Sequence, residues 1–366
     1  MSHQPIVESL RGELRGAPLV DGVHLGSIAA VAPDGAPVAA WGDPGTLVHL
    51  RSTAKPFQLM PLVMDGIHRA PLARKAGPGR AAKAGYTIEA ADLAVMMASH
   101  SGEPAHTGRV ARLLEYGGLE IDQLQCGAHP PVHVPTSHTL IAANREPTAL
   151  HCNCSGKHTG MLLVCTHKGW PLEDYLSVEH PLQRRILALV AGLSGVPIED
   201  IGLAVDGCSA PTFALPLSGL ALLFARLAAP EQAPEVEPGA RAALREIFAA
   251  GVAHPELVGG TGRLDTALMR ALGGVVFAKV GAMGAYGLGV GACERYPKGL
   301  GVAVKIADGD GADRVRRVVV PELLIQLGLL DRGFEDGPLR RAAAPETLNN
   351  RGMVVGKLRP CFEIFR

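Results

Sequence analysis

The chain has 366 residues, of which 47% are hydrophobic and 4% aromatic, a composition typical of a globular protein with a large core. Basic and acidic residues both number 35, so no excess of charge favours a nucleic acid or an acidic membrane as a partner. No apolar run reaches the roughly 18 residues that cross a bilayer, and no secretory signal is visible at the start. We therefore expect a cytoplasmic protein.

Seven cysteines are scattered along the chain. An odd number of cysteines without regular spacing does not form a disulfide framework in a reducing compartment. We expect these side chains to be thiols, metal ligands or small core residues.

Strand signals dominate the first 50 residues. Residues 26–31 and 37–41 are predicted to be strands joined at Asp34-Gly35, a strong hairpin signal. A helix is predicted to begin near Ser52, so the sheet leads directly into this helix.

The first turn of the predicted helix carries a serine and a lysine three residues apart. Ser52 and Lys55 share one helix face, and Pro56 is tolerated because its missing N–H has no partner in a first turn. A lysine beside a serine can remove the hydroxyl proton, and Ser-x-x-Lys is the spacing of serine β-lactamases and penicillin-binding proteins. The same spacing is also typical of an N-cap serine followed by a solvated lysine.

Two segments follow before the middle of the chain. Residues 70–86 are basic and rich in glycine, alanine and proline, and we expect a solvated surface there. Residues 90–97 predict a buried helix that ends at a polar loop containing Ser99 and Ser101. Polar groups at the end of a buried element either build a site or are plain loop residues, so both serines are candidates.

The densest polar chemistry lies at residues 151–160, His-Cys-Asn-Cys-Ser-Gly-Lys-His-Thr-Gly, before an apolar helix. A helix N-terminus favours thiolates and other anions. A later strand leads to Asp206 and Cys208. Cys154 and Cys208, with Lys157 nearby, either bind zinc, which prefers thiolate ligands, or are separate reduced thiols.

The last third returns to strand signals. Residues 212–250 predict helices, and a glycine-rich loop at 259–262 precedes another helix without matching either glycine pattern that cradles phosphate. Strands are predicted at 275–281, at 301–307 and at 354–364.

Sheet-forming segments at both ends of the chain predict one α/β sheet, with helices inserted between them and a late helix interrupted at Pro321. We expect a single unit over residues 1–366 with a discontinuous α/β part at about 1–70 and 270–366 and a mainly helical part at about 71–269.

Three features follow one another in the order of the penicillin-recognising enzymes: Ser-x-x-Lys, a serine-containing loop, and Lys-x-Gly on a late strand. The last is Lys279-Val280-Gly281. This order implies acyl transfer, in which Ser52 attacks a carbonyl after Lys55 takes its proton and backbone N–H groups hold the oxyanion. Lys279 would be the second cation that favours a neutral Lys55.

Six segments, in order, resemble the rhizobial-type L-asparaginases, a third structural class of these enzymes. They are residues 51–58, 99–104, 154–159, 206–211, 262–266 and 279–284. The resemblance spans about residues 5–364. It implies a glutaminase/serine-β-lactamase-like fold, usually a homodimer, and hydrolysis of L-asparagine, a small-molecule substrate, to L-aspartate and ammonia.

The resemblance also implies roles for single residues. It makes Ser52 with Lys55 one Ser-Lys pair and Ser99 with Lys279 a second, which favours Ser99 over Ser101. The segment at 70–86 departs from the family pattern by its greater length.

The resemblance further implies a zinc ion held by Cys154, Lys157 and Cys208. Arg51 and Asp206 match positions near the substrate pocket, where a cation and an anion suit the carboxylate and ammonium of an amino acid.

Other interpretations share part of these residues. A penicillin-binding or β-lactamase-like serine hydrolase uses the same Ser-Lys chemistry, although such enzymes act outside the cytoplasm. An L-glutaminase differs only in the amide that it accepts. A zinc-dependent structural or binding protein would leave the serines and lysines without a chemical role.

Overall fold

The computed structural model describes residues 3–69, 87–311, 313–334, 337–343 and 345–364. The basic segment predicted at 70–86 lies outside the described residues. The chain divides into two compact units, which we call the sheet unit and the helical unit. The sheet unit comprises Met1–Thr53, Leu215–Gln232 and Ala267–Arg366, and the helical unit comprises Ala54–Ala214 and Ala233–Thr266.

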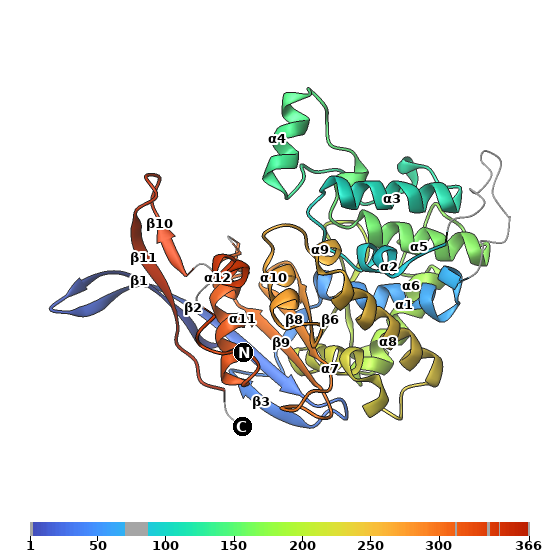
Figure 1. The fold of residues 1–366 in the computed structure, drawn as a ribbon. Helices are drawn as coiled ribbons and strands as arrows, with labels where there is room; N and C mark the ends of the chain where they lie inside the picture. The colour runs from blue at the N-terminus through green and yellow to red at the C-terminus, as the bar shows by residue number, and fades with distance from the viewer. Residues whose placement is uncertain (1–2, 70–86, 312, 335–336, 344, 365–366) are drawn as a thin grey trace. The chain divides into compact units, whose positions relative to one another are not determined.

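The sheet unit is built on an eight-stranded antiparallel sheet (Figure 1). Its strands are β1 (Gln4–Leu14), β2 (Ala17–Val31), β3 (Pro37–Trp41), β7 (Val276–Val280), β8 (Ala285–Val290), β9 (Leu300–Ile306), β10 (Glu346–Leu348) and β11 (Val354–Pro360). They are ordered β10-β11-β1-β2-β9-β8-β7, and β3 also pairs with β2. The predicted α/β class, with a sheet drawn from both chain ends, is confirmed.

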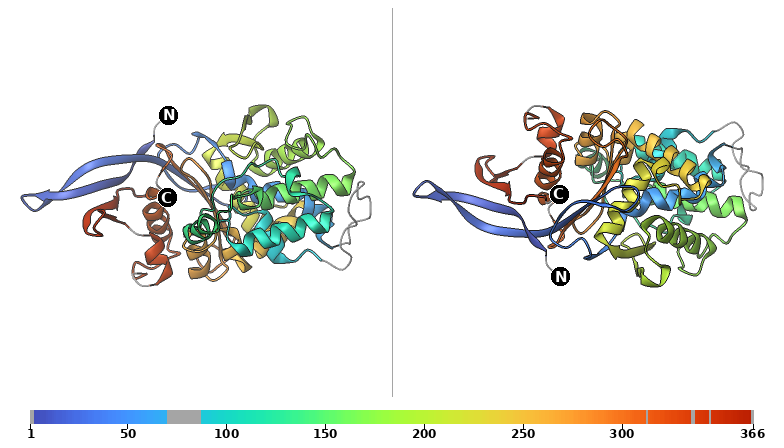
Figure 2. Two further views of the ribbon diagram at one scale, coloured as in Figure 1. Left: turned by 90° about the horizontal axis from the view of Figure 1, so that it is seen from above. Right: turned by 90° about the horizontal axis from the view of Figure 1, so that it is seen from below.

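Burial varies along this sheet. Strands β8 and β7, at one end of the strand order, are buried at every residue. The far halves of β1 and β2 are exposed and extend as a two-stranded ribbon (Figure 2). Helix α7 (Leu217–Ala228) packs on β2, β8 and β9, where Phe224 stacks on Phe277 with ring centroids 6.3 Å apart.

One predicted element of the sheet unit is confirmed, and two others need correction. The hairpin at Asp34-Gly35 is confirmed by the pairing of β2 with β3. Strand β8 was not predicted, because its sequence Ala-Tyr-Gly-Leu-Gly-Val has no alternating pattern. Helix α11 (Val315–Gln326) runs through Pro321 without the predicted interruption.

Two further helices are α10 (Leu264–Ala271), which begins in the helical unit, and α12 (Pro338–Ala343). A short strand, β4, spans Leu47–His49.

The helical unit packs around one helix that is buried at every residue but its last. Helix α1 (Lys55–Met64) is buried from Lys55 to Val63 and packs against α5, α6 and α8. The other helices are α2 (Ala90–Met96), α3 (Pro104–Gly117), α4 (Val134–Ala142), α5 (Ser155–Lys168), α6 (Pro181–Ser194), α8 (Pro238–Ala253) and α9 (Pro255–Val258). No described helix is both long and apolar enough to span a bilayer.

The stretch predicted as helical at 212–250 begins with a strand instead. Strand β6 (Pro211–Pro216) pairs antiparallel with β5 (Gly202–Val205). Its β-branched and aromatic residues, Thr212 and Phe213, suit a strand, and the prolines at its two ends favour extended backbone.

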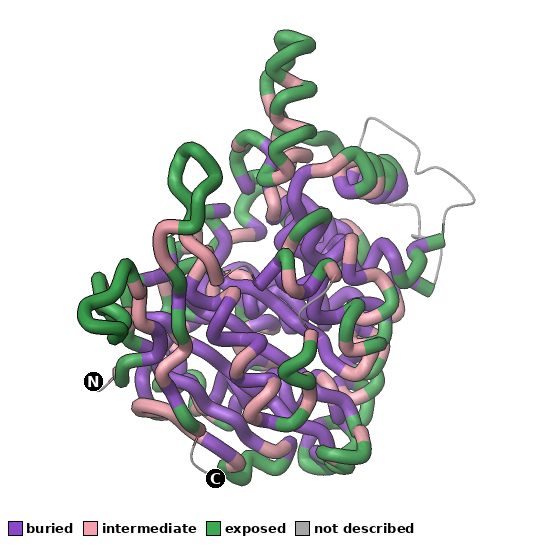
Figure 3. The backbone as a smooth tube through the Cα atoms, turned by 60° about the vertical axis from the view of Figure 1, so that its left-hand side comes forward, coloured by how far each residue is buried: buried purple, intermediate pink, exposed green. Residues whose placement is uncertain are grey.

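Helix α4 contains no buried residue. It stands out from the helical unit as an exposed helix (Figures 1 and 3). Its two chain connections lead to the loops described next.

Candidate active site

The Ser-x-x-Lys segment joins the two units along the chain. A 3-10 turn spans Arg51–Ala54 and α1 begins at Lys55, so the α-helix predicted from Ser52 begins three residues later. Pro56 lies in the first turn of α1, as predicted. Arg51 has a φ of 50°, a left-handed conformation that costs free energy for a residue other than glycine and is common at functional sites.

Lys55 is buried among oxygen atoms of its own unit. Its Nζ donates to the Ala98 carbonyl at 2.7 Å and to the Asn153 carbonyl at 3.1 Å, and it lies 3.0 Å from Ser99 Oγ. The side chain is only 2% exposed. A buried amine with three oxygen neighbours has a fixed orientation.

The two carbonyl groups decide what this amine can do. Carbonyl oxygens only accept hydrogen bonds, so they engage two N–H bonds of Lys55 in either protonation state. The remaining position faces the Ser99 hydroxyl. When the amine is neutral its lone pair therefore points at Ser99 Oγ, and when it is charged its third N–H does.

The two candidate serines in the loop after α2 have different hydrogen-bond partners. Ser101 Oγ donates to the Gly259 carbonyl at 2.9 Å, and a Cβ at Gly260, where φ is +120°, would lie 2.4 Å from that hydroxyl. Ser101 therefore holds two loops together. Ser99 is the serine of this loop whose hydroxyl reaches Lys55.

The glycine-rich loop at 259–262 is held by the carboxylate of Glu103, which follows the same loop after α2. Glu103 accepts the N–H and the hydroxyl of Thr261, both at 2.8 Å. Partial burial opposes ionisation, but the Thr261 hydrogen bonds outweigh it and lower the pKa of Glu103. The N–H of Thr261 is thus bound by protein, which agrees with the absence of a phosphate-binding glycine pattern.

A second buried lysine lies among sulfur atoms. Lys157 Nζ donates to Cys208 Sγ at 3.0 Å, and a hydrogen bond between the Cys154 and Cys208 thiols is the main cause that raises the pKa of Cys208. Burial alone would lower the pKa of Lys157, but the Cys208 and Cys154 sulfurs raise it above its ordinary value. Asp206 adds a weaker effect in the same direction.

Cys154, Lys157 and Cys208, which we call the sulfur cluster, have the donor atoms that zinc binds. Two sulfurs and one nitrogen converge, and soft thiolates are preferred zinc ligands. Among the described residues, no group of three or more His, Cys, Asp and Glu side chains forms a metal site, and this set has only two members of those types. The three donors fit a zinc ion once the lysine loses its proton.

Cys152 is a neighbouring thiol that contacts both Cys126 and Cys154. Its Sγ donates to the Cys126 carbonyl at 3.5 Å. Hydrogen bonding to Cys126 is the main cause that raises the pKa of Cys152 to about 11, which keeps it a protonated thiol.

The start of α5 explains how the cluster is positioned. The helix begins at Ser155, earlier than the apolar pattern indicated, so Lys157 and His158 lie in its first turns. A Cβ at Gly156 would lie 2.1 Å from the Val95 carbonyl oxygen, so only glycine allows α5 to approach α2 this closely. Burial is the main cause that lowers the pKa of His158 to about 4, and its Nδ1 lies 2.6 Å from the Tyr175 hydroxyl.

The remaining predicted site residues are distributed between the units. Lys279 is fully buried in β7 of the sheet unit, where its Nζ donates to the Val280 carbonyl at 3.1 Å. Arg51 and Ser52 are half-buried in the sheet unit. Asp206 is half-buried in the helical unit, in a tight turn before Cys208.

The structure adds one residue that the sequence did not single out. Asn153 links Lys55 to the sulfur cluster, since its carbonyl accepts a hydrogen bond from Lys55 and its side-chain Oδ1 accepts one from Cys154 Sγ at 3.0 Å. Its position between Cys152 and Cys154 was the one available signal.

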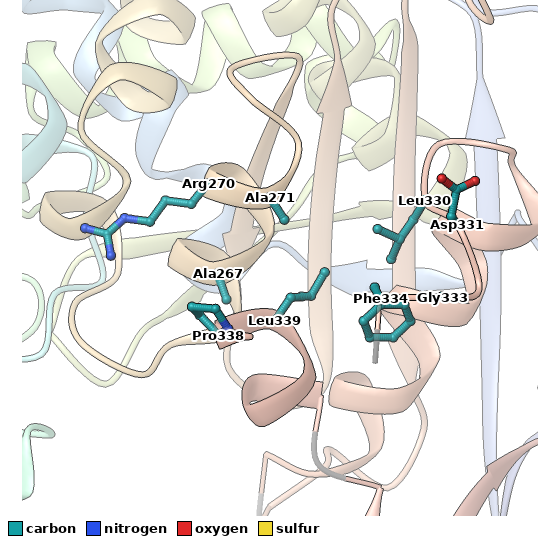
Figure 4. A pocket seen from close by; sticks show the side chains of 9 residues that line it. All are labelled: Ala267, Arg270, Ala271, Leu330, Asp331, Gly333, Phe334, Pro338 and Leu339. Carbon is teal, nitrogen blue, oxygen red and sulfur yellow. The ribbon is translucent and has the colours of Figure 1, made fainter. Parts of the chain in front are cut away.

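A pocket of about 460 Å³ in the sheet unit is lined by none of these residues. Its lining is largely apolar (Figure 4), and the Arg270 guanidinium points away from Phe334. A second pocket, of about 370 Å³, lies between α4 and the loop that contains His129.

Comparison with known proteins identifies the class. The chain matches the L-asparaginase II family over residues 7–360 and belongs to that family. Members are amidohydrolases, so the protein is an amidohydrolase. A search of curated protein sequences found no match.

Glutaminases are among the similar solved structures. A probable glutaminase from Bacillus subtilis is 14% identical, with 84% of this chain and 85% of that chain covered and a TM-score of 0.39. A Bacillus glutaminase is 13% identical, with coverages of 83% and 91% and a TM-score of 0.38.

Proposed function

We propose that the protein hydrolyses L-asparagine to L-aspartate and ammonia through a paired Ser-Lys centre. The observation that carries this proposal is the Lys55 amine, held by two carbonyl oxygens with its remaining position 3.0 Å from Ser99 Oγ. Membership of the L-asparaginase II family supports asparagine as the substrate.

The proposed reaction has two steps. Ser52 Oγ attacks the side-chain amide carbon of asparagine, and its proton passes through the Ser99 hydroxyl to the neutral Lys55 amine, whose lone pair faces that hydroxyl. Ser99, hydrogen-bonded to Lys55, relays that proton to the departing nitrogen, so ammonia leaves and a β-aspartyl ester of Ser52 remains. Water then attacks the ester, and its proton returns through Lys55 to Ser52 as aspartate is released.

Three further residues complete the proposal. Lys279 is assigned as the partner of Ser99 in the second Ser-Lys pair, and also as the second cation that favours the neutral form of Lys55. Arg51 and Asp206 are assigned to the carboxylate and ammonium of the substrate.

A zinc ion held by Cys154, Lys157 and Cys208 would supply a Lewis acid that polarises or orients an oxygen of the substrate. The residues of this cluster then need only hold the ion. A cytoplasmic location and a homodimer remain predictions.

The test is ammonia release from L-asparagine, L-glutamine and a β-aspartyl dipeptide, by the wild type and by Ser52→Ala. We expect turnover of L-asparagine above the other two and loss of turnover in the variant by at least about 1,000-fold. Ammonia release that is unchanged in Ser52→Ala would refute the mechanism. Preference for glutamine would make the protein an L-glutaminase.

Turnover of nitrocefin tests the remaining alternative, a β-lactamase-like serine hydrolase. A β-lactamase-like enzyme would open its β-lactam ring, whereas we expect no turnover above the uncatalysed rate. Turnover of nitrocefin without ammonia release would replace the asparaginase proposal.

A further inference from the structure

Asn153 lies between Lys55 and the sulfur cluster, and three of its four polar groups form hydrogen bonds. Its carbonyl accepts from Lys55 Nζ at 3.1 Å, its Oδ1 accepts from Cys154 Sγ at 3.0 Å, and its backbone N–H donates to His129 Nε2 at 3.2 Å. The residue that orients the amine is thus held at the main-chain groups on both sides of its Cα and at its side chain.

The His129 ring can hold this N–H in one tautomer only. Its Nδ1 lies 2.8 Å from the Pro130 carbonyl oxygen, which accepts hydrogen bonds and does not donate them. Nδ1 therefore carries the proton, and Nε2 is left as the acceptor that the Asn153 N–H requires. The ring is half-buried and lines the pocket beside α4.

We infer that His129 and Asn153 are positioning residues for Lys55, and that they act through the main chain of Asn153. This inference rests on the proposed function, because the orientation of Lys55 matters only if that amine moves protons. The Ala98 carbonyl fixes one N–H of Lys55 from the loop after α2, and the Asn153 carbonyl fixes the second from the loop before α5. If the second carbonyl swings away, the amine can rotate and its lone pair no longer faces Ser99.

The Asn153 side chain extends the link to the sulfur cluster. Because Oδ1 contacts Cys154 while the same residue's carbonyl contacts Lys55, a shift of Cys154 is transmitted to the amine through one residue. Neither contact involves the substrate, so the expected signature is a change in kcat with little change in KM.

The test uses His129→Phe, which removes the acceptor but keeps a planar ring, and His129→Gln, whose amide oxygen can take the place of Nε2. We expect His129→Phe to lower kcat for asparagine by about 10-fold to 100-fold with KM within about twofold, because small misplacements of catalytic groups have effects of this size. His129→Gln should recover most of the loss. His138→Phe, at an exposed histidine of α4, is the matched control and should keep wild-type activity.

A double variant tests whether His129 and Asn153 act on Lys55 by one route. Asn153→Ala should also lower kcat, and adding His129→Phe to it should cost less than the product of the two single effects. Elemental analysis of zinc should give the same content in His129→Phe and wild type, which separates a misplaced amine from a lost metal.

Three results would overturn the inference: wild-type kcat in His129→Phe, equal impairment of His129→Phe and His129→Gln, or a raised KM with unchanged kcat. If His129→Phe does not fold, the comparison of His129→Gln with Asn153→Ala decides, because wild-type kcat in Asn153→Ala is then the contrary result. A wild type that releases no ammonia would instead refute the proposed function.

Discussion

Two buried lysines of the helical unit lie close together in the fold but have neighbours of different kinds. Lys55 is surrounded by two carbonyl oxygens and a serine hydroxyl, whereas Lys157 lies against the Cys208 thiol with Cys154 beside it. The exposed fractions of the two lysines, 2% and 4%, are nearly equal. Burial alone therefore does not assign a role to either amine.

The neighbours assign the roles. Carbonyl oxygens fix the direction of an amine and leave one position free to exchange a proton with a hydroxyl, which suits a general base. Thiols bring soft donor atoms to the amine, which suits a metal ligand set. Substitutions that affect one cluster and not the other can break or sharpen this contrast.

Among substitutions near the two lysines, the largest effect is expected for Lys55→Met. It removes the amine that exchanges protons, so kcat for ammonia release should fall by at least about 100-fold. Lys55→Arg should not restore activity, because a guanidinium stays charged. Lys298→Met, at an exposed lysine, is the control. Retention of more than half of the wild-type activity in Lys55→Met would end the assignment.

Ser99→Ala is expected to have the next largest effect. It removes the hydroxyl 3.0 Å from Lys55 Nζ, so we expect kcat to fall by about 10-fold to 100-fold, within the range for loss of one proton-transfer group. The measurement is steady-state ammonia release beside Ser177→Ala, an exposed serine. Equal activity of the two variants would remove Ser99 from the mechanism.

Cys208→Ser addresses the sulfur cluster. It replaces a soft donor by a hard one, so zinc affinity should fall by at least about tenfold, as measured by competition with a chelator. Cys293→Ser, in the sheet unit, should bind zinc like the wild type. The same zinc affinity in both variants would exclude the proposed ligand set.

The smallest effect concerns Glu103, which connects the Ser99 loop to the glycine-rich loop. Its pKa in the folded protein is lowered from an ordinary value of 4.5, so its contribution to stability is complete above that value and is lost as the pH falls through the lower folded pKa. Glu103→Gln lacks this titration. The difference in Tm between wild type and Glu103→Gln should therefore shrink as the pH falls below the ordinary value of 4.5, and Tm curves that stay parallel would contradict this origin.

Local patterns predicted the outer parts of the fold and the chemical groups of the site. The turn at Asp34-Gly35 and the strand at 37–41 were predicted because turn chemistry is local. Strand β8 and the strand at 211–216 were missed, since a strand buried on both faces has no alternating pattern and a short one is decided by its partner.

The pairing within the site lies beyond sequence spacing. Lys55 and Ser99 are separated by 44 positions, and Asn153 contacts Lys55 through its carbonyl, a group that every residue carries. Motif order and resemblance could therefore name Ser99, Cys154 and Lys157, but not the carbonyl groups that orient the base.

The most direct test of the central claim is identification of the acylated residue. Wild-type protein would be mixed with L-asparagine, quenched in acid during turnover, digested and examined by mass spectrometry. The account predicts an added β-aspartyl group on the peptide that contains Ser52, and its absence from Ser52→Ala. An aspartyl group on Ser99, or turnover with no acylated serine in a quench fast enough to trap one, would contradict it.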